Sequence, residues 1–130
     1  MMFESLPSLK DLKGNYLVLK NIIWDIEPKQ LMEPRYTITA EGKKETKKIR
    51  SGYLFYIDKM SGKKPSLFLM CHTNTGYGET VALISEIPDE LITEAIEENK
   101  SKEFFRMYPI NKKIENWLKK ELGLNETSNP

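Results

Sequence analysis

Residues 71–80, CHTNTGYGET, hold the side chains of this 130-residue chain that are best suited to chemistry. The only cysteine and the only histidine, Cys71 and His72, are followed by hydroxyls, an amide and two glycines. A cysteine nucleophile needs a base within hydrogen-bond reach. The pattern predicts a strand over residues 66–72, where consecutive side chains point to opposite faces, so Cys71 and His72 cannot form a dyad. Because there is no second histidine, a Cys–His hydrolase is excluded.

The same counts argue against a zinc centre, while an oxygen-ligated magnesium or calcium site on Asp and Glu side chains stays open. Structural zinc sites use four cysteine or histidine ligands, and catalytic zinc sites usually use at least two histidines. One cysteine and one histidine cannot meet either requirement. We therefore expect no cofactor, and Cys71, aligned with Leu67 and Leu69, is interpreted as a small core residue.

The glycine-containing segment TNTGYG, residues 73–78, is interpreted as the tip of a hairpin. Backbone N–H groups in such a turn can form an anion-binding nest. However, the segment has neither the P-loop spacing nor the G-x-G-x-x-G spacing, and its glycines suit a tight turn. One alternative stays open, a small-ligand or enzyme site made of His72, Asn74, Tyr77 and Glu79. In that site Tyr77 is displayed between two glycines and His72 stands alongside it.

A second set of candidates combines basic side chains with an aromatic strand. Such combinations are typical of sheets that bind single-stranded nucleic acids, where bases stack on rings. In the expected strand, Tyr53 and Phe55 fall on the core side, and Arg50 and Tyr56 point outward. The net charge of +1 gives no overall attraction to nucleic acid, so single-stranded DNA or RNA binding is kept as an alternative function. Its candidate residues are Lys43, Lys44, Lys47, Lys48, Arg50 and Tyr56.

The hydrophobic pattern that must position these residues changes along the chain. We expect five strands, at residues 15–26, 35–41, 47–58, 66–72 and 79–87, after an opening helical turn at 8–14. Their short connections favour an antiparallel meander that forms a curled sheet or a half-barrel. Helices are expected at 88–99, 101–109 and 111–123. The fold class is therefore α+β, a five-stranded antiparallel sheet with C-terminal helices packed on it. Residues 1–124 are expected to form one domain, with a disordered tail at 125–130.

Large apolar side chains gather in the segment EFFRMYP, residues 103–109. If Phe104, Phe105 and Met107 do not all reach the core, they form a contact patch for a second chain. No run approaches the roughly 18 apolar residues of a membrane span, no secretory signal opens the chain, and a single cysteine fits a reducing compartment. We thus expect a cytoplasmic, non-enzymatic binding or adaptor protein that contacts a protein partner or its own copy, and no membrane.

Overall fold

Four antiparallel strands form the central sheet, in the order β5–β4–β3–β6. The computed structural model describes residues 6–29, 36–46, 51–59, 64–73 and 78–124. Strands β3 (Gly52–Asp58), β4 (Ser66–His72) and β5 (Gly78–Ile84) follow one another as a meander. The short strand β6 (Met107–Pro109) pairs with the outer edge of β3, from Tyr56 to Asp58. The fold is α+β, as predicted, but the sheet is open and has four strands, so the predicted five-stranded sheet is wrong.

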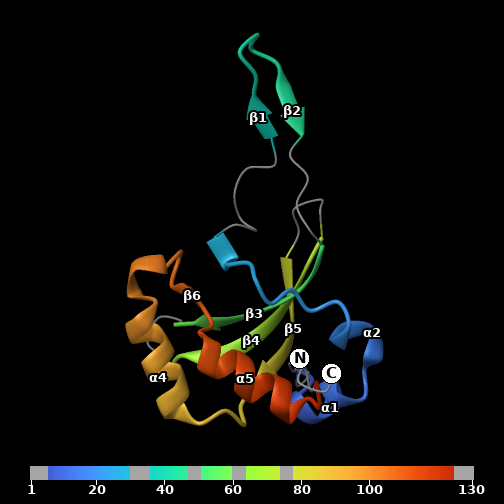
Figure 1. Cartoon of the computed structure of the whole chain (residues 1–130), viewed down its shortest axis with the longest axis vertical. Helices are drawn as coiled ribbons and strands as arrows, with labels where there is room; N and C mark the ends of the chain where they lie inside the picture. The colour runs from blue at the N-terminus through green and yellow to red at the C-terminus, as the bar shows by residue number, and fades with distance from the viewer. Residues whose placement is uncertain (1–5, 30–35, 47–50, 60–63, 74–77, 125–130) are drawn as a thin grey trace, which may run out of the picture.

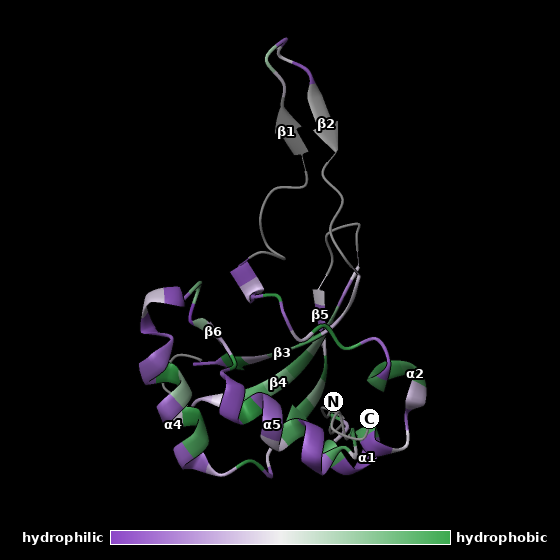
Figure 2. Ribbon diagram, viewed as in Figure 1, coloured by the Kyte–Doolittle hydropathy of each residue, from purple (hydrophilic) through white to green (hydrophobic). Residues whose placement is uncertain are grey.

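Four helices cover one face of this sheet (Figure 1). They are α1 (Leu9–Lys13), α2 (Tyr16–Leu19), α4 (Asp89–Glu98) and α5 (Lys112–Glu121). A 3-10 turn, η1 (Lys100–Lys102), follows α4. Hydrophobic residues concentrate in β3, β4 and β5, and they alternate with hydrophilic ones along α4 and α5 (Figure 2). The core between these layers includes Leu12, Phe55, Ile57, Leu67, Leu69, Ile84, Ile92, Ile114 and Leu118.

Helix α5 confirms the predicted C-terminal helix, and both of its ends are capped. The Asn111 side chain accepts a hydrogen bond from the Ile114 N–H at 3.0 Å, which satisfies a free amide of the first turn. Ile114 and Leu118, four residues apart, are fully buried against the sheet. Gly123 follows the helix with a φ of +76°, the left-handed conformation that terminates many helices.

A separate hairpin is formed by β1 (Tyr36–Ile38) and β2 (Lys44–Thr46). Tyr36 pairs with Thr46 and Ile38 with Lys44. Figure 1 shows this hairpin standing away from the four-stranded sheet. The predicted strand over residues 35–41 therefore exists in shortened form, but it is no part of the main sheet.

Two of the expected elements are wrong. Residues 16–19 form helix α2 rather than a strand over 15–26, because Asn15 caps the Val18 N–H at 3.1 Å and Val18 is buried. Within 15–26, only Ile22 forms a bridge to the sheet, a parallel one with Tyr53. Residues 101–109 were expected to be helical, but β6 completes the outer edge of β3, where Pro109 is tolerated. The expected tail at 125–130 lies outside the described part.

Candidate functional site

Cys71 lies at the end of the helix-covered face of the sheet. Its register partners are Tyr53 on β3 and Glu79 on β5, and alternation places it on the same face as Leu69. Its thiol is free and half-buried, because the strand is near its end there. Burial raises the pKa of the Tyr53 phenol, and Cys71 raises it further. The alternation of Cys71 and His72 is thus as predicted.

His72, by contrast, is not displayed beside the glycine loop, and that expectation is wrong. Only 1% of its surface is exposed, because the second face of the sheet is also covered. That face carries the buried cluster Leu54, Tyr56 and Met70, against which Ile26, Phe68 and Met107 pack. Glu79 is exposed and lies on the Cys71 face, so His72 and Glu79 do not converge. Asn74 and Tyr77 lie outside the described residues, so the loop site stays a prediction.

Tyr56 was expected to point outward as a platform for bases, and this orientation is also wrong. It is 5% exposed, its ring stacks on Phe68 at 5.7 Å, and its hydroxyl shares a hydrogen bond with Thr80 at 3.0 Å. Burial raises the pKa of the Tyr56 phenol, while the Thr80 hydrogen bond opposes that shift. Tyr56 is therefore a packed residue of the second face.

Lys43 and Lys44, the two basic candidates that the structure describes, lie on the β1–β2 hairpin and not on that strand. Lys43 is exposed at the turn of the β1–β2 hairpin, where its N–H donates to the Thr39 hydroxyl at 3.1 Å. Lys44 begins β2. Lys47, Lys48 and Arg50 lie outside the described residues. The described part of this set therefore belongs to the hairpin that stands away from the sheet (Figure 1).

The expected contact residues form a tight turn, which we call the 104–107 turn. Phe104 and Met107 exchange two backbone hydrogen bonds of 2.9 Å each. The two central residues, Phe105 and Arg106, have φ values of +51° and +67°, as in a type I′ turn. Such turns favour Asn and Gly, because a larger side chain in the left-handed region is strained. Phe105 is 78% exposed and its ring contacts that of Phe104 at 4.6 Å, while Met107 packs on the second-face cluster.

Neighbouring groups hold this turn in place. The Lys59 N–H donates to the Arg106 carbonyl at 2.9 Å, which extends the pairing of β3 and β6. The buried Asn99 side chain donates to the Pro109 carbonyl at 2.9 Å, and the Tyr108 hydroxyl donates to Glu103 at 3.0 Å. These bonds fix both ends of a strained turn whose tip projects an aromatic ring.

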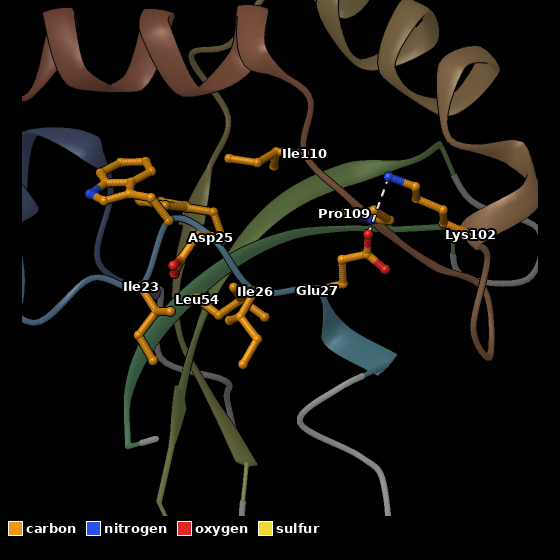
Figure 3. Close-up of a pocket in the computed structure, with 10 residues that line it drawn as sticks. Ile23, Asp25, Ile26, Glu27, Leu54, Lys102, Pro109 and Ile110 are labelled. Atoms are coloured by element: carbon orange, nitrogen blue, oxygen red, sulfur yellow. Dashed lines mark ion pairs between the residues drawn. The ribbon is translucent and has the colours of Figure 1, made fainter. Parts of the chain in front are cut away.

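A pocket that the sequence did not predict lies at the outer edge of β3, and we call it the edge pocket (Figure 3). It has a volume of about 190 Å³. Glu27 and Lys102 form an ion pair of 3.2 Å among its lining residues. A local signal existed in the alternating Trp24, Asp25, Ile26 and Glu27, but Lys102 is brought to them only by the tertiary fold. The lining residues are Ile23, Trp24, Asp25, Ile26, Glu27, Leu54, Phe55, Lys102, Pro109 and Ile110.

A second hollow, of about 270 Å³, lies between α1, α2 and the sheet. Tyr53 and Val81 form its floor, and Leu12 and Val18 are among the helical residues that line it. Tyr16 and Leu17, which are 71% and 68% exposed, belong to the same helix α2 as Val18. This end of the molecule thus also carries exposed apolar side chains, on a regular helical backbone.

Within the described ranges, no three His, Cys, Asp or Glu side chains are grouped so that they could hold a metal ion. In the same residues, no helix is long and apolar enough to cross a membrane. Fold and surface together define a class, an α+β protein with an open antiparallel sheet, C-terminal helices and a displayed aromatic turn. Comparisons with protein-family models, curated proteins and solved structures found no match.

Proposed function

We propose that this chain is a protein-binding module that contacts its partner, another protein or a second copy, through the 104–107 turn. The observation that carries the proposal is the combination of strain and exposure at Phe105. A left-handed backbone costs a non-glycine residue about 1–2 kcal/mol. Such strain persists only where the surroundings impose it, and it is concentrated at functional sites. Here Phe105 and Arg106 both carry it, and Phe105 is 78% exposed.

The chemistry of the turn suits an interface anchor. Aromatic residues and arginine are enriched among the side chains that contribute most to binding energy. The turn presents one of each, next to one another, on a base fixed by β6 and by the Asn99 hydrogen bond. A base of this kind limits the entropy lost when the ring is buried, because the backbone is already ordered.

The test compares two exposed aromatic positions. A photo-reactive benzoylphenylalanine replaces Phe105 in one variant and Tyr16, which is 71% exposed on helix α2, in the control. Both variants are expressed in the organism that encodes the chain, irradiated, and analysed by mass spectrometry. We expect one dominant crosslinked protein, or a crosslinked dimer, from position 105 only, and its loss when Arg106 is also changed to alanine. Equal yields from both positions, or none from position 105, contradict the proposal.

A second candidate is binding of single-stranded DNA or RNA by the β1–β2 hairpin. It is supported by the exposed Lys43 on a hairpin that stands away from the sheet, followed in the sequence by further basic residues (Figure 1). When lysines neutralise phosphates, the affinity falls steeply with salt. For single strands, each phosphate contact lowers the logarithm of the binding constant by roughly 0.7 for every tenfold rise in salt concentration.

Fluorescence anisotropy with a labelled oligonucleotide tests this candidate over a range of salt. One variant has Lys43, Lys44, Lys47, Lys48 and Arg50 replaced by glutamine. The matched control loses five exposed lysines elsewhere, namely Lys10, Lys13, Lys20, Lys112 and Lys120. A salt slope that decreases only in the first variant supports the candidate. Equal effects, or no binding at low salt, exclude it.

A further inference from the structure

The hollow between α1, α2 and the sheet, which we call the α1–α2 hollow, is an apolar cup with an accessible floor. Leu12 and Val18 form its inner wall and are 4% and 9% exposed. Tyr53 and Val81 form the floor and are half-buried, so a side chain from outside can reach them. The exposed residues at its mouth are Pro7, Asp11 and Asn15.

The α1–α2 hollow has room for one aromatic side chain. Its volume is about 270 Å³. An apolar cavity of roughly 150 Å³ binds benzene. A phenyl ring therefore fits and leaves space for part of a neighbouring side chain. Placing a ring there is favourable because apolar surface is removed from water on both sides of the contact.

Phe105 is the exposed side chain that suits this hollow. At 78% exposed, it is the most exposed large hydrophobic side chain of the described residues. Tyr16, on α2, lies two residues before Val18 and about 200° around the helix from it, so its ring points away from the hollow. In Figure 1, α1 and α2 lie on one side of the molecule and β6, into which the 104–107 turn leads, lies on the other. The turn of a second copy, and not that of the same copy, can therefore reach the hollow.

The charges beside the two features are complementary. Asp11, at the mouth of the hollow, accepts the N–H and the hydroxyl of Ser8 through Oδ2, at 2.8 and 3.3 Å, which leaves Oδ1 for another donor. Within the described ranges, no lysine or arginine forms an ion pair with Asp11. Arg106 is exposed beside Phe105 and lies near Asp58, whose pKa it lowers, but in the same ranges these two side chains form no ion pair. The Arg106 guanidinium can thus reach a carboxylate on another chain.

We propose that this chain associates head to tail with copies of itself, with Phe105 of one copy in the α1–α2 hollow of the next and Arg106 beside Asp11. The inference rests on the proposed function, because it names the partner of the 104–107 turn and the surface that receives it. Each copy carries one turn and one hollow, so the contact is heterologous and produces open chains or rings. Because the centre of the contact is one ring and one exposed ion pair, the association is weak and depends on concentration.

A mixing experiment with two variants tests this geometry. The turn variant, Phe105→Ser with Arg106→Ala, keeps the hollow, and the hollow variant, Val81→Phe, fills the hollow with a ring of its own. Sedimentation velocity is expected to show that the wild-type chain associates as its concentration rises and that each variant alone is a monomer. Their mixture should form a one-to-one dimer and nothing larger, because one intact turn and one intact hollow remain. A symmetric contact would give no dimer in that mixture.

Single substitutions measure the parts of the contact. Phe105→Ser is expected to weaken self-association by about 30-fold, as for a residue that dominates an interface. Asp11→Asn keeps an oxygen for the Ser8 N–H and should weaken self-association by about threefold, as for an exposed ion pair. Tyr16→Ser is the control, because it removes an exposed ring that does not line the hollow, and it should change nothing.

Nitrogen-15 NMR locates the contact even if Val81→Phe does not fold. The labelled turn variant is titrated with unlabelled wild-type chain, and the shifts should be confined to residues 7–18, 53 and 81. A wild-type chain that stays monomeric at millimolar concentration, a mixture without dimer from two folded variants, or shifts elsewhere would overturn the inference. The proposed function survives that result if the crosslinker at position 105 captures a different protein or another surface of a second copy. A lack of any crosslink from position 105 contradicts the proposed function itself.

Discussion

Gly52, the first residue of β3, is the described glycine at which one added methyl group should disturb the fold most. A Cβ atom built there lies 2.6 Å from the Asn21 carbonyl oxygen and 2.9 Å from two carbons of Ile23. That carbonyl already accepts the Tyr53 N–H at 3.0 Å. Gly52→Ala therefore pushes against backbone that is bonded to the next residue of the same strand. The φ of Gly52, +157°, adds strain for any larger residue.

The expected loss is large for a single methyl group. Overpacking a well-packed site costs about 1–3 kcal/mol, and an unfavourable backbone conformation adds about 1 kcal/mol or more. A total of about 2–4 kcal/mol is a sizeable part of the roughly 5–15 kcal/mol that stabilises a domain. At about 3–5 °C per kcal/mol for a chain of this size, the Tm should fall by about 6–20 °C.

Urea denaturation measures this loss, and Gly14→Ala is the matched control. Gly14 has a φ of −94°, and nothing lies within 4 Å of an added Cβ. Alanine there is expected to be neutral or to stabilise by less than about 1 kcal/mol. Trp24 reports local displacement of the 21–23 segment, because its ring stacks on Phe55. If Gly52→Ala is as harmless as the control, the close approach of Asn21 and Ile23 to β3 is wrong.

Three further predictions concern the second face and the turn. Tyr56→Phe removes the Thr80 hydrogen bond and should lower the free energy of unfolding by about 1 kcal/mol in urea denaturation, and a gain would contradict that bond. Burial raises the pKa of Asp58 and Arg106 lowers it, so Arg106→Gln should raise that pKa further in a carboxyl NMR titration. Because the folded pKa exceeds the unfolded one, stability falls as the pH rises between the two, and Asp58→Asn should remove that slope. Replacing Phe105 and Arg106 together by Asn and Gly should raise the unfolding free energy by about 1 kcal/mol while abolishing crosslinking, whereas a clear loss would show that Phe105 packs.

The elements that the sequence predicts well are those fixed by neighbouring residues. Helix α5 has its cap, its apolar stripe and its terminating glycine within residues 111–123. Strands β3, β4 and β5 show apolar runs joined by short connections, which favours antiparallel pairing. The wrong elements depend on distant partners. Residues 107–109 form a strand because the outer edge of β3 is open to them, and nothing in EFFRMYP itself encodes that pairing.

The expected exposure of His72 and Tyr56 was wrong for a related reason. The alternation of β4 side chains between the two faces of the sheet was predicted correctly. The second face, which carries His72 and Tyr56, was assumed to be exposed. The nearly continuous apolar run SLFLMCH is itself typical of a strand that is buried on both faces. Under that interpretation, His72 and Tyr56 are expected to be buried. The edge pocket brings together Glu27 and Lys102, which lie far apart in the sequence, so only the assembled fold reveals it.

The turn and the pocket both include residues of β6, yet each can be altered separately. Lys102 and Pro109 line the pocket, while Phe105 and Arg106 form the tip of the turn between them in the sequence. Changing Phe105 removes exposed surface and leaves every lining residue in place. Changing Glu27 alters the pocket without touching the turn. A variant of Phe105 that loses crosslinking but keeps the amide signals of Ile57 and Tyr108 therefore places the effect at the tip of the turn. Displacement of those amide signals would instead mean that β6 no longer pairs with β3.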